Sequence, residues 1–348
     1  MKKYTALEKI LHRQFLGNST VSNYLFNRIL EKAKKHRQDE SKNHIFVTGL
    51  ARSGTTALLN KIYSSGEVSS FVYKYMPFTL SPKLAEIFSN FSNKSKTTDT
   101  VRFHNDGINI NIDSPECLDE IFWIKSKHLF NEELKNSEEF KSQLINAYSY
   151  YLDSFSFIDG DKKMIIKNNN NHTRLIELTN YFKDSTFILM IREPLAHANS
   201  LLNQHLNFLN LQNNDPFILE YMNLIGHNEF GKNAIPFEYI GIENSWHKNL
   251  SKNSLDYWIT QWIKTYQWIL NSNFIKRENI LIVPYERLCK ENSFYKKICK
   301  KINIVNHKSG LQFKSANKYF SSKMLIKNDD LVSKSKMIYD DLFEKSNF

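Results

Sequence analysis

The stretch between residues 44 and 63 constrains the fold more than any other part of this 348-residue chain. It reads HIFVTGLARSGTTALLNKIY, and its β-favouring run 45–48 predicts a buried strand. Gly49 and Gly54 bound a short loop, after which Thr55 begins a helix with periodic apolar residues. A strand, a glycine-bounded loop and a helix in this order gather backbone N–H groups and a helix N-terminus around one point, which attracts an anion. The stretch therefore predicts an α/β fold that holds a phosphate.

This loop departs from the pattern of nucleoside-triphosphate loops, G-x-x-x-x-G-K-[ST], at one position. Gly49, Gly54 and Thr56 match the pattern, but Thr55 replaces the lysine that would reach the β- and γ-phosphates. Arg52 supplies a cation at a different place. The loop therefore suits a phosphate or sulfonate ester better than a triphosphate, and an ordinary strand–turn–helix without a ligand is the alternative interpretation.

Charge and cysteine content narrow the class of protein. The net charge is +11, which favours an anionic partner such as a nucleotide, an acidic glycan, a membrane surface or nucleic acid. The three cysteines have no metal-site spacing and form an odd number, so neither a disulfide framework nor a zinc site is indicated.

No segment approaches the ~20 apolar residues that span a bilayer, and the N-terminus lacks a signal-length apolar run. We expect a soluble, cytoplasmic protein.

Strand and helix patterns alternate along the chain, which predicts a three-layer α/β sandwich with a central parallel sheet and helices on both faces. The run 185–191 is continuously apolar and is typical of a central parallel strand. The predicted strands are 45–48, 68–75, 102–113, 163–167, 185–191 and 280–283. The predicted helices are 4–37 with a break near 17–18, 55–62, 82–91, one opened by 114–116, 137–155, 173–182, 194–208, 254–273 and 331–343.

No repeat or linker divides the sequence, so we expect a single domain over residues 1–348. Within it we predict an N-terminal helical segment, 1–42, a catalytic core, 43–318, and a C-terminal helical tail, 319–348. Amphipathic helices usually face a core, which favours docking of 1–42 on the core over contact with a membrane surface.

A second anion site is predicted where another strand ends. Ligands of such sheets bind at the carboxyl ends of strands. Arg52 and Arg192 each come after a predicted strand, and Lys167 ends one. Arg192 precedes a helix that starts at Pro194, and Ser200 lies eight residues after Arg192. A guanidinium fork and a hydroxyl together suit a phosphate. Structural roles for both residues, in capping and packing, are the alternative.

These motifs together resemble the sulfotransferases that use 3′-phosphoadenosine 5′-phosphosulfate (PAPS). The loop RSGTT, 52–56, resembles their 5′-phosphosulfate loop. The Arg-Glu-Pro at 192–194 with the helix serine resembles their 3′-phosphate site, and the YERL at 285–288 resembles their Tyr-Glu-Asp-Leu stretch. The resemblance covers roughly residues 44–318, and 102–123 looks like bacterial members of the group. It assigns donor binding to Arg52, Ser53, Gly54, Thr55, Thr56, Arg192 and Ser200.

The resemblance implies a P-loop-NTPase-like sulfotransferase fold and a defined reaction. The sulfonate of PAPS would pass by in-line displacement to a hydroxyl of a carbohydrate or glycolipid, with PAP as product and no metal. Because PAPS has no γ-phosphate, the missing lysine fits. The implied partners are the nucleotide donor and a glycan or glycolipid acceptor. Separately, we expect no nucleic-acid partner, and we expect peripheral contact with the inner face of the membrane. A basic segment, 308–318, is expected to close over the nucleotide.

Sulfonate transfer needs a base for the acceptor hydroxyl and a cation near the bridging oxygen. Arg52 is the first choice for the cation and Lys167 the second, although 168–169 is Asn-Asn where the family often has a small residue and proline. A histidine has the more convenient unperturbed pKa for a base, whereas a glutamate needs burial to raise its own. The candidates for the base are His104, Glu116 and Glu120.

Two other classes of function remain open from the sequence. A P-loop kinase or NTPase is disfavoured by Thr55. A module that binds nucleic acid or an anionic glycan would rest on the +11 charge, but that charge is scattered along the chain.

Overall fold

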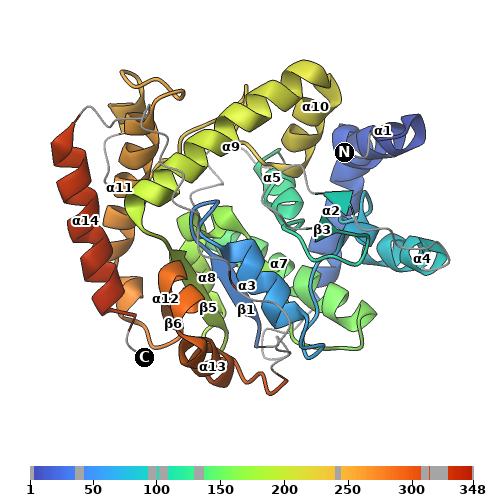
Figure 1. The fold of residues 1–348 in the computed structure, drawn as a ribbon. Helices are drawn as coiled ribbons and strands as arrows, with labels where there is room; N and C mark the ends of the chain where they lie inside the picture. The colour runs from blue at the N-terminus through green and yellow to red at the C-terminus, as the bar shows by residue number, and fades with distance from the viewer. Residues whose placement is uncertain are drawn as a thin grey trace.

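A four-stranded parallel sheet lies at the centre of the protein (Figure 1). The computed structural model describes residues 4–35, 43–92, 100–101, 109–128, 137–239, 244–306, 313 and 328–346. The strand order is β4-β1-β5-β6, and all three pairings are parallel, as predicted. The strands are β1 (Ile45–Thr48), β4 (Ile165–Lys167), β5 (Thr186–Ile191) and β6 (Ile280–Pro284).

Both faces of the sheet are buried, which confirms the three-layer arrangement. Along β1, Phe46 packs into the larger core, whereas Ile45 and Val47 pack into a second core on the opposite face. This alternation follows from the two-residue period of a strand. The second core is covered by α3 (Thr55–Tyr63), α12 (Tyr285–Lys290) and α13 (Asn292–Lys301), and the larger one by α7 (Glu138–Ile158), α8 (Leu175–Tyr181) and α11 (Leu255–Asn271).

The N-terminal segment docks on the core, as predicted. The helix is interrupted before Asn18, whose side chain caps α2 (Ser19–Ala33) by accepting from the Val21 amide at 3.3 Å. Phe26 and Ile29 of α2 are buried, and α2 packs against α7. The preceding elements are α1 (Ala6–His12) and the π-helical turn η1 (Arg13–Gly17).

Most predicted helices are present, and the prolines at 82 and 194 each open one. None of the described helices combines the length and apolar character that crossing a membrane requires. The division of the chain into 1–42, 43–318 and 319–348 stays a prediction. The remaining helices are α4 (Pro82–Ser92), α5 (Glu120–His128), α9 (Pro194–Asn214), α10 (Pro216–Ile225), α14 (Asp329–Glu344), η3 (Tyr73–Tyr75), η4 (Asn169–Arg174), η5 (Asn244–His247) and η6 (Asn273–Lys276).

The predicted strand 68–75 is wrong. The segment contributes one isolated bridge to the sheet, from Ser69 to Met164, and then turns into η3. The hydroxyl of Ser70 donates to the carbonyl of Ile165 at 2.9 Å, so it occupies an acceptor that a longer parallel ladder would use.

The predicted helix opened by 114–116 is also wrong, because α5 begins only at Glu120. Residue Pro115 instead bridges to Val72, and the Glu116 amide donates to the carbonyl of Phe71 at 2.9 Å. Pairing with a distant segment thus outweighs the local helix-start signal. Of the predicted strand 102–113, the structure describes residues 109–113, and only β3 (Asn109–Ile110) is strand, whereas 111–113 lies in a turn. This short strand pairs antiparallel with β2 (Thr100–Val101). Residues 102–108 of this prediction lie outside the described residues.

Candidate active site

The loop between β1 and α3 requires glycine at both ends. Gly49 has φ +129°, and a Cβ there would lie 2.4 Å from the carbonyl oxygen of Met190 on β5. Gly54 has φ +97°, and a Cβ there would lie 2.3 Å from the ring of Tyr285. The loop is therefore pressed against the end of β5 and the start of α12, and only glycine leaves the room for this approach.

A buried histidine on α9 forms a hydrogen bond with the backbone of the same loop. His197 on α9 is fully buried, and its Nε2 donates to the Ala51 carbonyl at 2.8 Å. Its Nδ1 accepts from the indole N–H of Trp262 at 3.2 Å, which fixes the neutral tautomer because an indole only donates. Burial, followed by the charges of Arg192 and Arg52, lowers the pKa of His197 to about 3. His197 was not among the site residues predicted from the sequence.

The hydroxyls of the loop have different surroundings. Thr55 Oγ1 donates to the side-chain oxygen of Asn169 at 3.1 Å, and the Asn169 carbonyl accepts from Thr48 at 3.4 Å. Ser53 Oγ is buried and has no hydrogen-bond partner among the described residues. Thr56 lies half-buried in the first turn of α3. Asn169, which departs from the family pattern, thus supports the loop.

Arg192 and Ser200 meet the loop from the next strand. Arg192 follows β5, and its Nη1 donates to the Arg52 carbonyl at 2.9 Å. Its guanidinium carbon lies 5.8 Å from the centre of the Tyr285 ring. Ser200 on α9 accepts a hydrogen bond from Arg52 Nε at 3.2 Å. The two anion sites predicted from the sequence are therefore in direct contact.

Lys167 and Glu116 form a buried ion pair at the end of β4. Lys167 Nζ lies 3.3 Å from Glu116 Oε1, with 3% and 5% of the two side chains exposed. Glu116 also accepts from the Tyr73 hydroxyl at 3.0 Å and from the Cys117 amide at 2.9 Å. Because β4 pairs with β1 through Val47 and Lys167, this pair lies at the same edge of the sheet as the loop.

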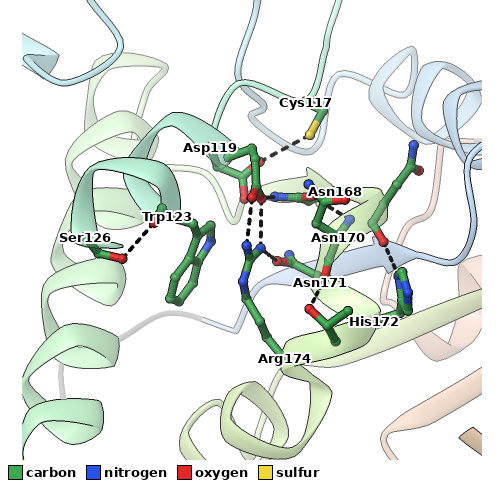
Figure 2. Close-up of polar contacts among 12 residues, drawn as sticks. Cys117, Asp119, Trp123, Ser126, Asn168, Asn170, Asn171, His172 and Arg174 are labelled. Atoms are coloured by element: carbon green, nitrogen blue, oxygen red, sulfur yellow. Dashed lines mark hydrogen bonds and ion pairs between the residues drawn. The ribbon is translucent and has the colours of Figure 1, made fainter. Parts of the chain in front are cut away.

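Glu120, the third candidate for the base, shares a buried hydrogen-bond network with Asp119. Figure 2 shows Asp119, Asn168 and Arg174 of this network. Asn168 donates to Asp119 at 3.0 Å and to Glu120 at 2.9 Å, and Arg174 binds Glu120 through two nitrogens at 2.7 and 2.8 Å. Burial works against ionisation of Glu120, but the charge and hydrogen bonds of Arg174 outweigh it and lower the pKa of this carboxyl. The Glu120 carboxylate is thus fully engaged in a structural contact.

The pKa of Asp119 shifts in the opposite direction to that of Glu120. It accepts from the Tyr148 hydroxyl at 2.7 Å, yet burial raises the pKa of Asp119 to about 6. The segment 116–120 is therefore joined to 167–174 by several buried polar contacts, which hold Lys167 and Glu116 in register.

Two further predictions concern His104 and the basic segment 308–318. His104 and the basic segment 308–318, apart from Phe313, lie outside the described residues. Phe313 packs edge-on against Tyr285, with ring centres 6.4 Å apart. Nowhere in the described ranges do three or more His, Cys, Asp or Glu side chains gather in a way that would hold a metal ion.

The parallel sheet and the glycine-bounded loop that leads into α3 define a P-loop-like α/β protein. The family model described as "Sulfotransferase family" matches residues 44–224, more than half of the chain. The chain belongs to the sulfotransferase family, and it is an enzyme that transfers a sulfonate group to an acceptor. The match begins just before β1 and ends within α10, so it includes the loop, Lys167, Arg192 and Ser200.

Among solved structures, the chain is similar to three bacterial sulfotransferases or sulfotransferase domains. Sulfotransferase STF9 from Mycobacterium avium is 9% identical with a TM-score of 0.48, and STF1 from Mycobacterium tuberculosis H37Rv is 12% identical with a TM-score of 0.44. Both alignments cover 99% of this chain and 87% of the other. The sulfotransferase domain from the curacin biosynthetic pathway is 15% identical, with a TM-score of 0.37 and coverage of 86% and 97%. No curated protein matches the chain.

Proposed function

We propose that this sulfotransferase takes its sulfonate from PAPS and transfers it to a hydroxyl of a carbohydrate or glycolipid. The observation that carries the donor assignment is the contact between the two predicted anion sites. Arg52 reaches Ser200, and Arg192 reaches the Arg52 backbone, so the ends of β1 and β5 form one continuous surface. A nucleotide with phosphate groups at both its 3′ and 5′ positions suits such a surface.

The residues of the 49–54 loop fit a phosphate group. Ser53 Oγ is buried without a partner among the described residues, and a buried hydroxyl in that state is costly unless a ligand completes it. The N-cap of α3 is Gly54, so no side chain caps the helix start in the described part of the chain. Its first N–H groups and the positive end of its dipole favour an anion.

In this proposal each residue has one role toward the donor. Ser53, Gly54 and the first turn of α3, with Thr55 and Thr56, hold the 5′-phosphate. The side chains of Arg192 and Ser200 hold the 3′-phosphate. PAPS, when bound, supplies the sulfonate and a good leaving group. Arg52 lies between the two sites and stabilises the charge that develops on the bridging oxygen.

Glu116 is our choice for the base, and Lys167 for its partner. The Glu116 carboxylate accepts the proton of the acceptor hydroxyl while the acceptor oxygen bonds to sulfur and the bond to the 5′-phosphate oxygen breaks. Lys167, 3.3 Å away, balances the charge of the carboxylate before the reaction and adds a second cation to the strand edge. His104 remains the alternative base, and variants of the two residues distinguish them.

The proposed acceptor class rests on the family resemblance and on charge, and the proposed place of reaction rests on charge. A net charge of +11 attracts acidic glycans and the anionic inner face of a membrane, where a glycolipid would be met. We therefore propose a cytoplasmic enzyme with peripheral membrane contact.

The test is a transfer assay with sulfur-labelled PAPS against fractionated host glycans and lipids. We expect label in a carbohydrate-containing fraction, and a loss of about 10²–10³ in rate for Arg52→Ala with the fold retained. A thermal-shift titration with PAP runs beside it. Magnesium-dependent turnover of ATP, without PAP binding, would instead support the P-loop kinase alternative.

A further inference from the structure

Glu286 connects two parts of the chain that are far apart in sequence. It follows β6 in the first turn of α12. One of its carboxylate oxygens accepts the backbone N–H of Glu193 at 2.9 Å. The other accepts the hydroxyl of Tyr339, on α14, at 2.7 Å. Both oxygens of this carboxylate are therefore engaged, one on each side.

The contact with Glu193 fixes the backbone next to Arg192. Glu193 uses its own carboxylate to cap α9, accepting from the amides of Leu195 at 3.2 Å and Ala196 at 2.7 Å. Its N–H belongs to the peptide bond that Arg192 begins, and Glu286 holds that bond in one orientation. Because the Tyr285 ring also faces the Arg192 guanidinium, residues 285–286 contact both the Arg192 side chain and the N–H of the next residue.

Tyr339 lies on α14, a helix that packs against the core of the protein. Ile338 and Leu342 of α14 are 4% and 0% exposed and belong to the larger core, and α14 lies against α11 (Figure 1). Burial, followed by the charge of Glu286, raises the pKa of Tyr339, so its hydroxyl stays protonated and remains a donor. This helix lies beyond the residues that the family model matches.

We propose that Glu286 and Tyr339 are positioning residues for Arg192, so that the C-terminal helix sets the preference for a nucleotide with a 3′-phosphate. This inference rests on the proposed function, because it takes Arg192 as the 3′-phosphate ligand. Neither residue touches the nucleotide in this account. Tyr339 orients Glu286, Glu286 orients the peptide bond after Arg192, and the guanidinium is thereby held ready for the phosphate.

The experiment compares two probes, PAP and AMP, which differ in the 3′-phosphate. For Tyr339→Phe we expect PAP to bind about 3- to 10-fold more weakly, since one hydrogen bond to a charged group is lost, and AMP to bind as in the wild type. Glu286→Ala should show the same selective loss. Glu286→Gln should restore most of the preference, because its amide offers an oxygen to the Glu193 N–H and an N–H₂ to the tyrosine oxygen.

The matched control is Tyr75→Phe, which removes the hydroxyl of another buried tyrosine, one that packs against Phe155. It should leave the ratio of PAP to AMP affinity unchanged. Equal weakening of PAP and AMP binding in Tyr339→Phe, or no change in either, would overturn the inference. A wild-type protein that binds PAP no better than AMP would overturn the proposed function itself, so the two failures are distinguishable.

Discussion

The side chain of Arg52 crosses from the 49–54 loop to α9, where its Nε donates a hydrogen bond to Ser200 Oγ at 3.2 Å. These two residues are 148 positions apart in sequence. The contact joins the residue proposed to act on the sulfonate with a residue proposed to hold the 3′-phosphate. Binding of the nucleotide and positioning of the reacting cation are therefore expected to depend on each other.

Ser200→Ala tests this dependence. The variant removes both the acceptor for Arg52 and a ligand of the 3′-phosphate, so PAP affinity should fall about tenfold. Calorimetric titration measures it. Ser154→Ala, which removes a hydroxyl that donates within α7 to the Tyr150 carbonyl at 2.8 Å, is the control. Wild-type affinity in Ser200→Ala would contradict the assignment.

Glu116→Gln separates the chemical step from donor binding. The amide cannot take a proton from the acceptor, so kcat should fall about 10²–10³-fold while PAP affinity changes by less than about twofold. Glu138→Gln, at the exposed start of α7, should keep full activity. If His104→Gln is inactive and Glu116→Gln is active, His104 is the base.

Lys167→Met tests the buried ion pair as a structural element. Leaving Glu116 charged without its partner should cost about 3–5 kcal/mol of unfolding free energy. The double variant Lys167→Met with Glu116→Gln removes both charges and should recover part of that loss. Urea unfolding of the four proteins gives the coupling, and additive losses would show that the two side chains do not interact.

Asp119 should make stability depend on pH. Its pKa in the folded protein is about 6, above the ordinary value of 3.8, so the folded state binds more protons between these values. Its contribution to stability is therefore present at low pH and is lost as pH rises through about 6. The unfolding free energy of Asp119→Asn relative to wild type should rise by about 2 kcal/mol from pH 4 to pH 7. Asp184→Asn, at an exposed site, should differ from wild type in unfolding free energy by the same amount at both pH values. The same independence of pH for Asp119→Asn would refute the raised pKa.

His197→Phe should weaken the support of the loop. Two buried partners, the Ala51 carbonyl and the Trp262 N–H, lose their hydrogen bonds, at a cost of about 2–4 kcal/mol near pH 7. The pKa of His197 is lowered from 6.5 to about 3, so the wild-type contribution is present above pH 6.5 and is lost as pH falls. The difference between the two proteins should therefore shrink from pH 7 to pH 5. His227→Phe, a half-buried histidine, is the control, and a difference independent of pH would contradict the lowered pKa.

The sheet and the loop were predictable because their signals are local. The apolar run 185–191 and the spacing of Gly49 and Gly54 depend on few neighbours, and the structure confirms β5 and the strand–loop–helix order. The start of α5 was not predictable from 114–116, because the Glu116 amide bonds to a carbonyl 45 positions away, at Phe71. Tertiary pairing therefore determines the conformation of residues 114–116.

The residues that hold the loop in place, His197 and Asn169, could not be predicted from the sequence for a similar reason. His197 lies 146 positions from the carbonyl that it holds, and Asn169 lies 114 positions from Thr55. A histidine on an apolar helix face and an asparagine in a polar run are ordinary in sequence. Polar residues just after a buried strand were the one available signal for Asn169. The partners of Glu286 on α9 and α14 carry no local signal.

The central claim is that this enzyme holds a nucleotide with phosphates at both its 3′ and 5′ positions. Calorimetric titration of the wild type and Arg192→Ala with PAP, and with magnesium ATP, tests it most directly. We expect wild type to bind PAP more tightly than ATP. We expect Arg192→Ala to lose about tenfold or more of the PAP affinity, with its ATP affinity unchanged. Tighter binding of ATP than of PAP, unaffected by Arg192→Ala, would contradict it.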